Sequence, residues 1–239
     1  MTFQRDTIQK AELIFVFLIM TAGALFELWP FQVFGILFFC FLVFCTQIRN
    51  GMALVMAMVP NIAAMSIGAG PGLLVLAFTI ILVKLLLNRQ FGIKLWPICI
   101  IILLYLFCLS FTRFFDGNVY DFALVCQVAV IVITWTSLLP KLSTEDSLML
   151  IDYFRFGCLL MSLGMIISYP FQVDAIGRFK AISDDCNYTG AVMCVLLGIS
   201  LLTYCYKLPL KHNEFYMFLA VVMGLATGSR GFILSTAII

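Results

Sequence analysis

Long apolar segments separated by short polar ones run along the whole chain. The apolar segments lie at about residues 13–26, 31–46, 52–67, 72–87, 95–111, 122–139, 148–169, 188–204 and 215–226, and another begins near residue 231. Several approach the roughly 20 residues that a spanning helix needs, and backbone in lipid must satisfy its own hydrogen bonds. The pattern predicts an all-α fold, a polytopic transmembrane helical bundle of about nine complete spans plus a truncated tenth.

Composition supports a membrane protein. Hydrophobic residues make up 64% of the 239 residues and charged residues 11%, whereas a soluble domain usually carries about 25% charged residues. The nine cysteines include no CxxC pair and fall mostly inside apolar segments, which is typical of packing residues rather than a disulfide framework or metal site. We expect no cofactor, no metal and no nucleic-acid partner.

Local signals interrupt or begin three of these segments. Pro60 and Asn61 lie inside the third segment, where they predict a kink rather than a broken helix lining a cavity. Residues 68–72, GAGPG, predict a tight turn, because neither the strand nor the Lys-Ser/Thr pair of a phosphate loop flanks them. Ser143 and Asp146 have the spacing of a cap at the start of the seventh helix.

Two further patterns concern helix packing. Asp152 and Arg155 are three residues apart and predict an ion pair within the seventh helix. Gly190, Cys194 and Gly198 follow one another at intervals of four. A stripe of small residues allows another helix to approach closely, so the eighth helix is predicted to be packed centrally.

The positive charges divide unequally between alternate connections. Arg155 lies inside a predicted helix and is left out of the count. The set of connections that begins with the N-terminus contains Arg5, Lys10, Arg49, Lys84, Arg89, Lys94, Lys141, Lys207 and Lys211. The other set contains Arg113, Arg178, Lys180 and Arg230. Lysine and arginine are enriched in cytoplasmic loops. The N-terminus is therefore predicted to be cytoplasmic, and the loop 170–187 and the turn 227–231 to be external.

These two external segments contain Arg178, Lys180 and Arg230 and precede the eighth and tenth helices. Helix N-termini carry free N–H groups and a partial positive charge, and guanidinium groups bind phosphate in a two-pronged fashion. The segments therefore predict a site for a lipid phosphate or diphosphate headgroup. The alternative is that the arginines only anchor helix ends at the interface. Asp184 and Asp185 are expected to cap the eighth helix.

The same segments carry a resemblance. The run GRFKAISDDCNY at 177–188, followed one helical hairpin later by TGSRG at 227–231, resembles the O-antigen ligase and O-antigen polymerase superfamily of bacterial envelope glycan enzymes. That family has an Arg before a Gly-Asp-Pro-Asn-Tyr-like segment, and then Thr-Gly-Ser-Arg-Gly. The matching residues are Arg178, Asp185, Asn187, Tyr188, Gly228, Ser229, Arg230 and Gly231. Cys186 stands where proline is usual, and Asp184 replaces the preceding glycine.

The resemblance implies a membrane glycosyltransferase of the bacterial inner (cytoplasmic) membrane, acting on its external face. The donor would be a glycan on undecaprenyl diphosphate, and an acceptor hydroxyl would attack the anomeric carbon with inversion, without metal or nucleotide sugar. Arg178 and Arg230 would be catalytic, binding the diphosphate leaving group. The resemblance further implies substrate-binding roles for Asp185, Asn187, Tyr188, Ser229 and Gly231. Lys180 is expected to join them because of its positive charge in the external loop.

The catalytic base of the family is thought to be a histidine in a large external loop that follows these motifs. His212 is predicted to be cytoplasmic, so we do not assign it that role. We expect residues 1–239 to be a single transmembrane domain, the N-terminal part of a longer protein. By itself this part is expected to be inactive.

Four functions are compatible with these patterns. The leading one is a polymerase that joins lipid-linked repeat units, and the closest alternative is a ligase that moves finished glycan onto a lipid or protein. A transporter with Pro60, Asn61 and Gln127 along its pathway is a third, but few charged residues lie inside the apolar segments, unlike in coupled transporters. The fourth is a non-catalytic subunit working with other polysaccharide assembly proteins.

Overall fold

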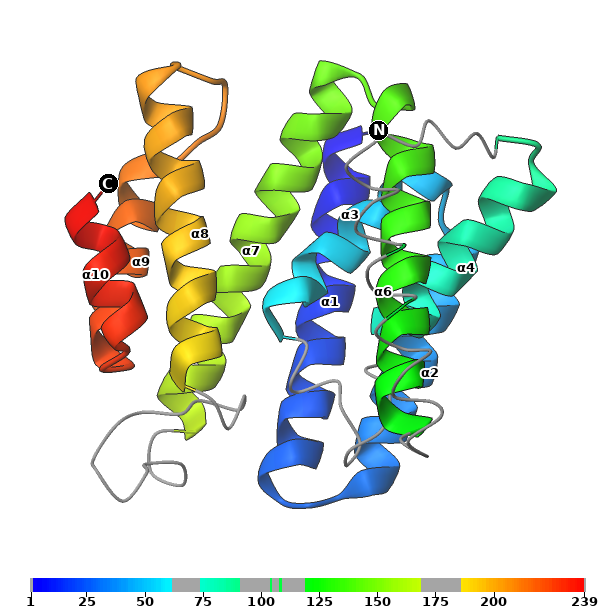
Figure 1. The fold of residues 1–239 in the computed structure, drawn as a ribbon, viewed down its shortest axis with the longest axis horizontal. Coiled ribbons are helices and arrows are strands. Elements are labelled where there is room, and N and C mark those ends of the chain that lie inside the picture. Colours follow the sequence, from blue (N-terminus) through cyan, green and yellow to red (C-terminus); the bar gives the residue numbers. More distant parts are fainter. Residues whose placement is uncertain are drawn as a thin grey trace.

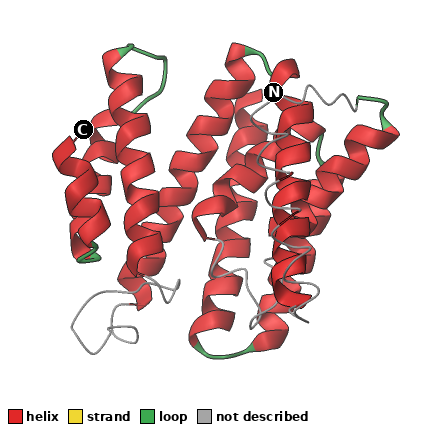
Figure 2. Cartoon of the chain, viewed as in Figure 1, coloured by secondary structure: helices red, strands yellow, loops and turns green. Residues whose placement is uncertain are grey.

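A computed structural model of the protein describes residues 2–61, 74–90, 104, 108, 119–168 and 186–238. Within these ranges every regular element is a helix (Figure 2), which confirms the all-α class. The predicted fifth segment and the turn at 68–72 lie outside the described residues, apart from Leu104 and Cys108, which are helical.

The described helices follow the apolar segments closely. They are α1 (Thr2–Leu25), α2 (Trp29–Cys45), α3 (Ile48–Met58), α4 (Leu74–Leu87), α6 (Val119–Leu138), the 3₁₀ turn η2 (Leu139–Lys141), α7 (Thr144–Ser168), α8 (Cys186–Cys205), α9 (Asn213–Ala226) and α10 (Arg230–Ile238). The main departure is α1, which begins well before the predicted residue 13. Its polar first turns are stabilised by contacts of Asp6, Gln9 and Lys10 with α7.

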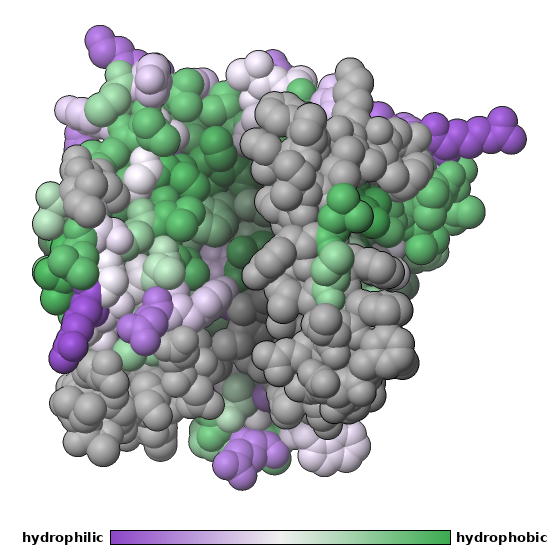
Figure 3. Space-filling view, in the orientation of Figure 1, coloured by the Kyte–Doolittle hydropathy of each residue, from purple (hydrophilic) through white to green (hydrophobic). Residues whose placement is uncertain are grey.

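Three of the described helices are long and apolar enough to cross a membrane: Asp6–Leu25, Thr144–Ser168 and Cys186–Cys205. Large apolar side chains also cover much of the surface; on α2 the exposed ones include Phe34, Leu37, Phe41 and Phe44. Among the residues coloured in Figure 3, hydrophobic ones occupy most of the surface between the two ends, and the strongly hydrophilic ones lie mainly toward the upper and lower ends. Such extended apolar patches are unusual on soluble monomers and fit a surface that faces lipid.

Helix α7 is the central helix of the bundle. One buried cluster joins residues of α1, α2, α3, α4, α6 and α7, and a second joins α7, α8, α9 and Phe232 of α10. Figure 1 accordingly shows α7 between the two groups of helices. Helix α8, predicted to be packed centrally, packs against α7, α9 and α10 in the second group, but it is α7 that joins the two groups. Gly190 and Cys194 contact α10 as expected, but a Cβ on Gly198 would meet nothing within 4 Å.

Helix α7 is held against α3 at a very close crossing. A Cβ on Gly157 would lie 2.0 Å from the carbonyl oxygen of Ala57, so only glycine fits there. Helix α3 ends just before Pro60 and passes into a 3₁₀ turn, Val59–Asn61. The Asn61 side chain donates a hydrogen bond of 3.0 Å to the carbonyl of Gly157. The chain therefore changes from α to 3₁₀ conformation at this point. Residues 62–67 of the predicted span lie outside the described part, so the kink stays a prediction.

The predicted cap of α7 is confirmed. The backbone N–H of Asp146 donates to Ser143 Oγ over 3.1 Å, and the backbone N–H of Ser143 donates to Asp146 Oδ2 over 3.0 Å. Asp146 also forms an ion pair of 3.2 Å with Arg49 at the start of α3. These reciprocal bonds satisfy donors that a helix start leaves free.

The predicted ion pair between Asp152 and Arg155 is wrong. Asp152 instead binds Lys10 of α1, with Nζ 2.8 Å from Oδ2. The Arg155 guanidinium lies 4.1 Å from the centroid of the Tyr216 ring and donates to the carbonyl of Lys211 over 2.7 Å. The spacing along α7 allows the pair, but Lys10 of α1 binds Asp152 instead and Tyr216 of α9 packs against Arg155.

The helix ends define two faces of the bundle. The N-terminal face contains the starts of α1, α3 and α7 and the loop 206–212 between α8 and α9, joined by the contacts just described. The opposite face contains the α1–α2 turn, the start of α8 and the α9–α10 turn, as Figure 1 shows.

Candidate functional site

The starts of α8 and α10 meet at the opposite face. Ser229 Oγ donates to Asn187 Oδ1 over 3.4 Å, which joins the two segments that the sequence analysis selected, although they are far apart in the chain. Gly190, one turn into α8, permits this approach, because a Cβ there would lie 2.6 Å from the Cβ of Ser229. Two helix N-termini therefore lie next to each other at this face.

The α9–α10 turn is held by its own hydrogen bonds. Thr227, which is buried, donates from Oγ1 to the carbonyl of Gly224 over 2.7 Å and accepts from the backbone N–H of Ser229 over 3.2 Å. Gly228 follows α9 with φ 59, a left-handed conformation that favours glycine. Ser229 Oγ then accepts from the N–H of Phe232 over 3.4 Å and caps α10. The turn thus has a defined geometry.

Thr227 lies in the predicted turn 227–231 but is not among the predicted site residues. A threonine hydroxyl two residues before a serine N–H is typical of a turn in which the side chain replaces a backbone acceptor. That local pattern was a usable signal for this residue.

Arg230 is the first residue of α10, and its side chain is exposed. Its guanidinium forms no hydrogen bond or ion pair with the residues that the structure describes. Gly231, the next residue, is also exposed. A free guanidinium beside a helix N-terminus provides a positive charge together with N–H donors, the combination that favours an anion.

Tyr188 has a different position from the other matched residues. It is half-buried, and its hydroxyl donates over 2.8 Å to the carbonyl of Val59 in the 3₁₀ turn after α3. The side chain therefore reaches across to α3 and ties the start of α8 to it.

Among the predicted site residues, the structure brings Asn187, Ser229, Arg230 and Gly231 together at one face. Arg178, Lys180 and Asp185, together with Asp184, lie outside the described residues. Groups of three or more His, Cys, Asp or Glu side chains that could hold a metal do not occur in the described part of the chain.

Comparisons of the chain with protein-family models, with curated proteins and with solved structures produced no match.

Proposed function

We propose that this chain belongs to a membrane glycosyltransferase that polymerises undecaprenyl-diphosphate-linked repeat units on the external face of a bacterial inner membrane. The observation that carries the proposal is the Ser229–Asn187 contact. It places Asn187, near the end of the first motif, beside Ser229 of the second, although a helical hairpin separates them in the sequence.

The chemistry follows from the charges at this face. Attack of an acceptor hydroxyl on the anomeric carbon breaks the bond to the diphosphate oxygen, so negative charge develops on the leaving group. The exposed guanidinium of Arg230 and the N-termini of α8 and α10 supply positive potential where that charge develops. Arg178 and Lys180 are proposed to complete the site from the preceding loop. Asn187 and Ser229 hold the two helix starts in register.

The charge distribution supports the proposed orientation, with about nine complete spans, the start of a tenth and a cytoplasmic N-terminus. The described helix ends and loops at the N-terminal face carry Lys10, Arg49, Lys84, Arg89, Lys141, Lys207 and Lys211. At the opposite face, the cation within the described residues is Arg230. Because lysine and arginine are enriched in cytoplasmic loops, this distribution supports an external position for the proposed site.

The test is the glycan profile of cells in which the native gene is replaced by variants of the full-length gene at matched protein level. Loss of one charge-stabilising donor typically lowers the rate about 100-fold, so Arg230→Ala should accumulate single lipid-linked repeat units. Arg230→Lys should recover only part of the activity, because lysine lacks the two-pronged geometry. Lys207→Ala, an exposed change at the N-terminal face, is the matched control.

Two other outcomes are informative. Accumulation of long lipid-linked chains that fail to reach an acceptor would identify a ligase instead of a polymerase. If the glycan profile of Arg230→Ala is the same as the profiles of wild type and of Lys207→Ala, Arg230 does not bind the diphosphate. The proposal then loses its main support.

A further inference from the structure

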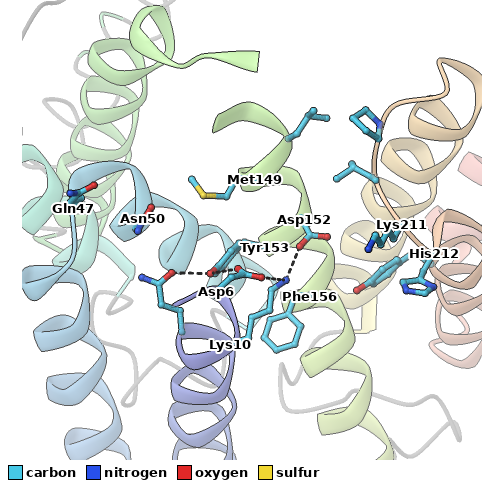
Figure 4. Close-up of a pocket in the computed structure, with 15 residues that line it drawn as sticks. Asp6, Lys10, Gln47, Asn50, Met149, Asp152, Tyr153, Phe156, Lys211 and His212 are labelled. Atoms are coloured by element: carbon cyan, nitrogen blue, oxygen red, sulfur yellow. Dashed lines mark hydrogen bonds and ion pairs between the residues drawn. The ribbon is translucent and has the colours of Figure 1, made fainter. Parts of the chain in front are cut away.

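A cavity of about 870 Å³ opens at the N-terminal face, between the starts of α1, α3 and α7 and the α8–α9 loop. Its lining includes Lys10, Asp152 and Tyr153 on one side and Lys211 and His212 on the other (Figure 4). Tyr216 of α9 also lines it. This cavity is separate from the proposed catalytic face, which lies at the other end of the helices.

The side formed by α1 and α7 has already paired its polar groups. Lys10 Nζ lies 2.8 Å from Asp152 and 3.2 Å from Asp6. The Tyr153 hydroxyl is 2.8 Å from Asp6 Oδ1 and 3.0 Å from Gln9 Oε1. Figure 4 shows these side chains converging on one another. Both carboxylates therefore have a cation or a hydroxyl as partner.

Arg155 presents the opposite situation. Its side chain is completely buried, yet within the described chain it has no carboxylate at ion-pair distance. Nη2 donates to the carbonyl of Lys211, while Nε and Nη1 have no hydrogen-bond partner in that same part of the protein. A buried cation with unused donors is unfavourable unless an anion or another acceptor reaches it.

The guanidinium lies directly behind the cavity wall. Its two contacts, the Lys211 carbonyl and the Tyr216 ring, belong to residues that line the cavity. The Lys211 side chain is exposed and forms no hydrogen bond or ion pair with the described residues, and His212 next to it is exposed as well. A ligand in the cavity reaches Arg155 only if the Lys211 carbonyl or the Tyr216 ring moves aside, because these two groups lie between the guanidinium and the cavity.

We propose that this cavity binds a phosphate group, with Arg155 and Lys211 as its ligands. Phosphate oxygens supply the acceptors that Nε and Nη1 lack, and arginine and lysine are the side chains that most often bind phosphate. The group could come from free phosphate in the cytoplasm or from the headgroup of an anionic lipid, since both have this chemistry. Neither source depends on the proposed glycosyltransferase activity.

The test uses the purified full chain and two probes. Binding of radiolabelled inorganic phosphate is measured in a neutral detergent, and retention of phosphatidylglycerol against phosphatidylcholine is measured by native mass spectrometry after release from nanodiscs. Loss of one charged hydrogen-bonding partner should weaken binding about tenfold or more. Arg155→Gln and Lys211→Gln should both show this loss, whereas Lys207→Gln, in the same loop but outside the cavity lining, should bind as wild type.

The two probes distinguish the sources. Saturable phosphate binding that both variants weaken assigns a free-phosphate site, and selective retention of phosphatidylglycerol that both weaken assigns a lipid site. The proposal is overturned if wild type binds neither probe, or if binding is the same in Lys211→Gln and Lys207→Gln. Because Lys211 is exposed, this last comparison decides the question even where Arg155→Gln fails to fold.

Discussion

The crossing of α3 and α7 provides the sharpest test of the fold. Gly157→Ala would place a methyl group 2.0 Å from the Ala57 carbonyl oxygen and 2.7 Å from its carbon. The obstacle is backbone, so the helices themselves must separate. Overpacking of this kind costs about 1–3 kcal/mol. Separation also weakens the Asn61 hydrogen bond to Gly157, worth about 1 kcal/mol.

One effect opposes this loss. Alanine is better than glycine inside a helix by about 1 kcal/mol, which offsets the weakened hydrogen bond. The expected net result is a decrease of about 1–3 kcal/mol in the free energy of unfolding. Unfolding by sodium dodecyl sulfate in mixed micelles, followed by circular dichroism, measures it.

Gly198→Ala is the matched control, since it makes the same chemical change where a Cβ meets nothing within 4 Å. This variant should be as stable as wild type or gain up to about 1 kcal/mol. Asn61→Ala isolates the hydrogen bond and should lose about 1 kcal/mol. If Gly157→Ala and Gly198→Ala unfold at the same detergent fraction, the close approach of α3 to α7 is refuted.

Three further changes test other contacts by the same unfolding measurement. Ser143→Ala removes the cap shared with Asp146 and should cost about 0.5–2 kcal/mol; equal stability would show that the cap contributes nothing. Lys84→Met removes an ammonium that donates to three carbonyls at the end of α2 and should cost about 1–2 kcal/mol. Equal stability would show that solvent replaces the ammonium at these carbonyls. Gly190→Ala should separate the starts of α8 and α10 at Ser229 and cost about 1–3 kcal/mol, with a parallel loss in the glycan assay; full activity would contradict the proposed site.

Local chemistry was enough to predict most helices. Runs of apolar residues bounded by polar ones located α2, α4 and α6 to α10 within a few residues, and a three-residue spacing predicted the Ser143–Asp146 cap. These features depend on residues that are neighbours in sequence. Length and hydropathy also made the chain a membrane-protein candidate, which the three long apolar helices support. The number of spans and the orientation remain predictions.

The candidate site was predicted only in part. The motifs selected Asn187, Ser229, Arg230 and Gly231, and alternation of the helices suggested that they share a face. Their contact, however, depends on how closely α10 approaches Gly190, and this is a property of packing. Tyr188 belongs to the same motif, yet its hydroxyl donates to the carbonyl of Val59, in the 3₁₀ turn that follows α3.

The sequence by itself determined which segments are helical and apolar, where α7 is capped and where positive charge accumulates, because each of these follows from residues close together in the chain. Only the tertiary structure decided the partners of the buried charges. Asp152 and Arg155 lie three residues apart on α7, but Lys10 comes from α1 and Tyr216 from α9. Spacing along one helix cannot indicate which other helix lies beside it. Those neighbours gave the two residues different partners, and within the described part of the chain they left Arg155 without a carboxylate at ion-pair distance.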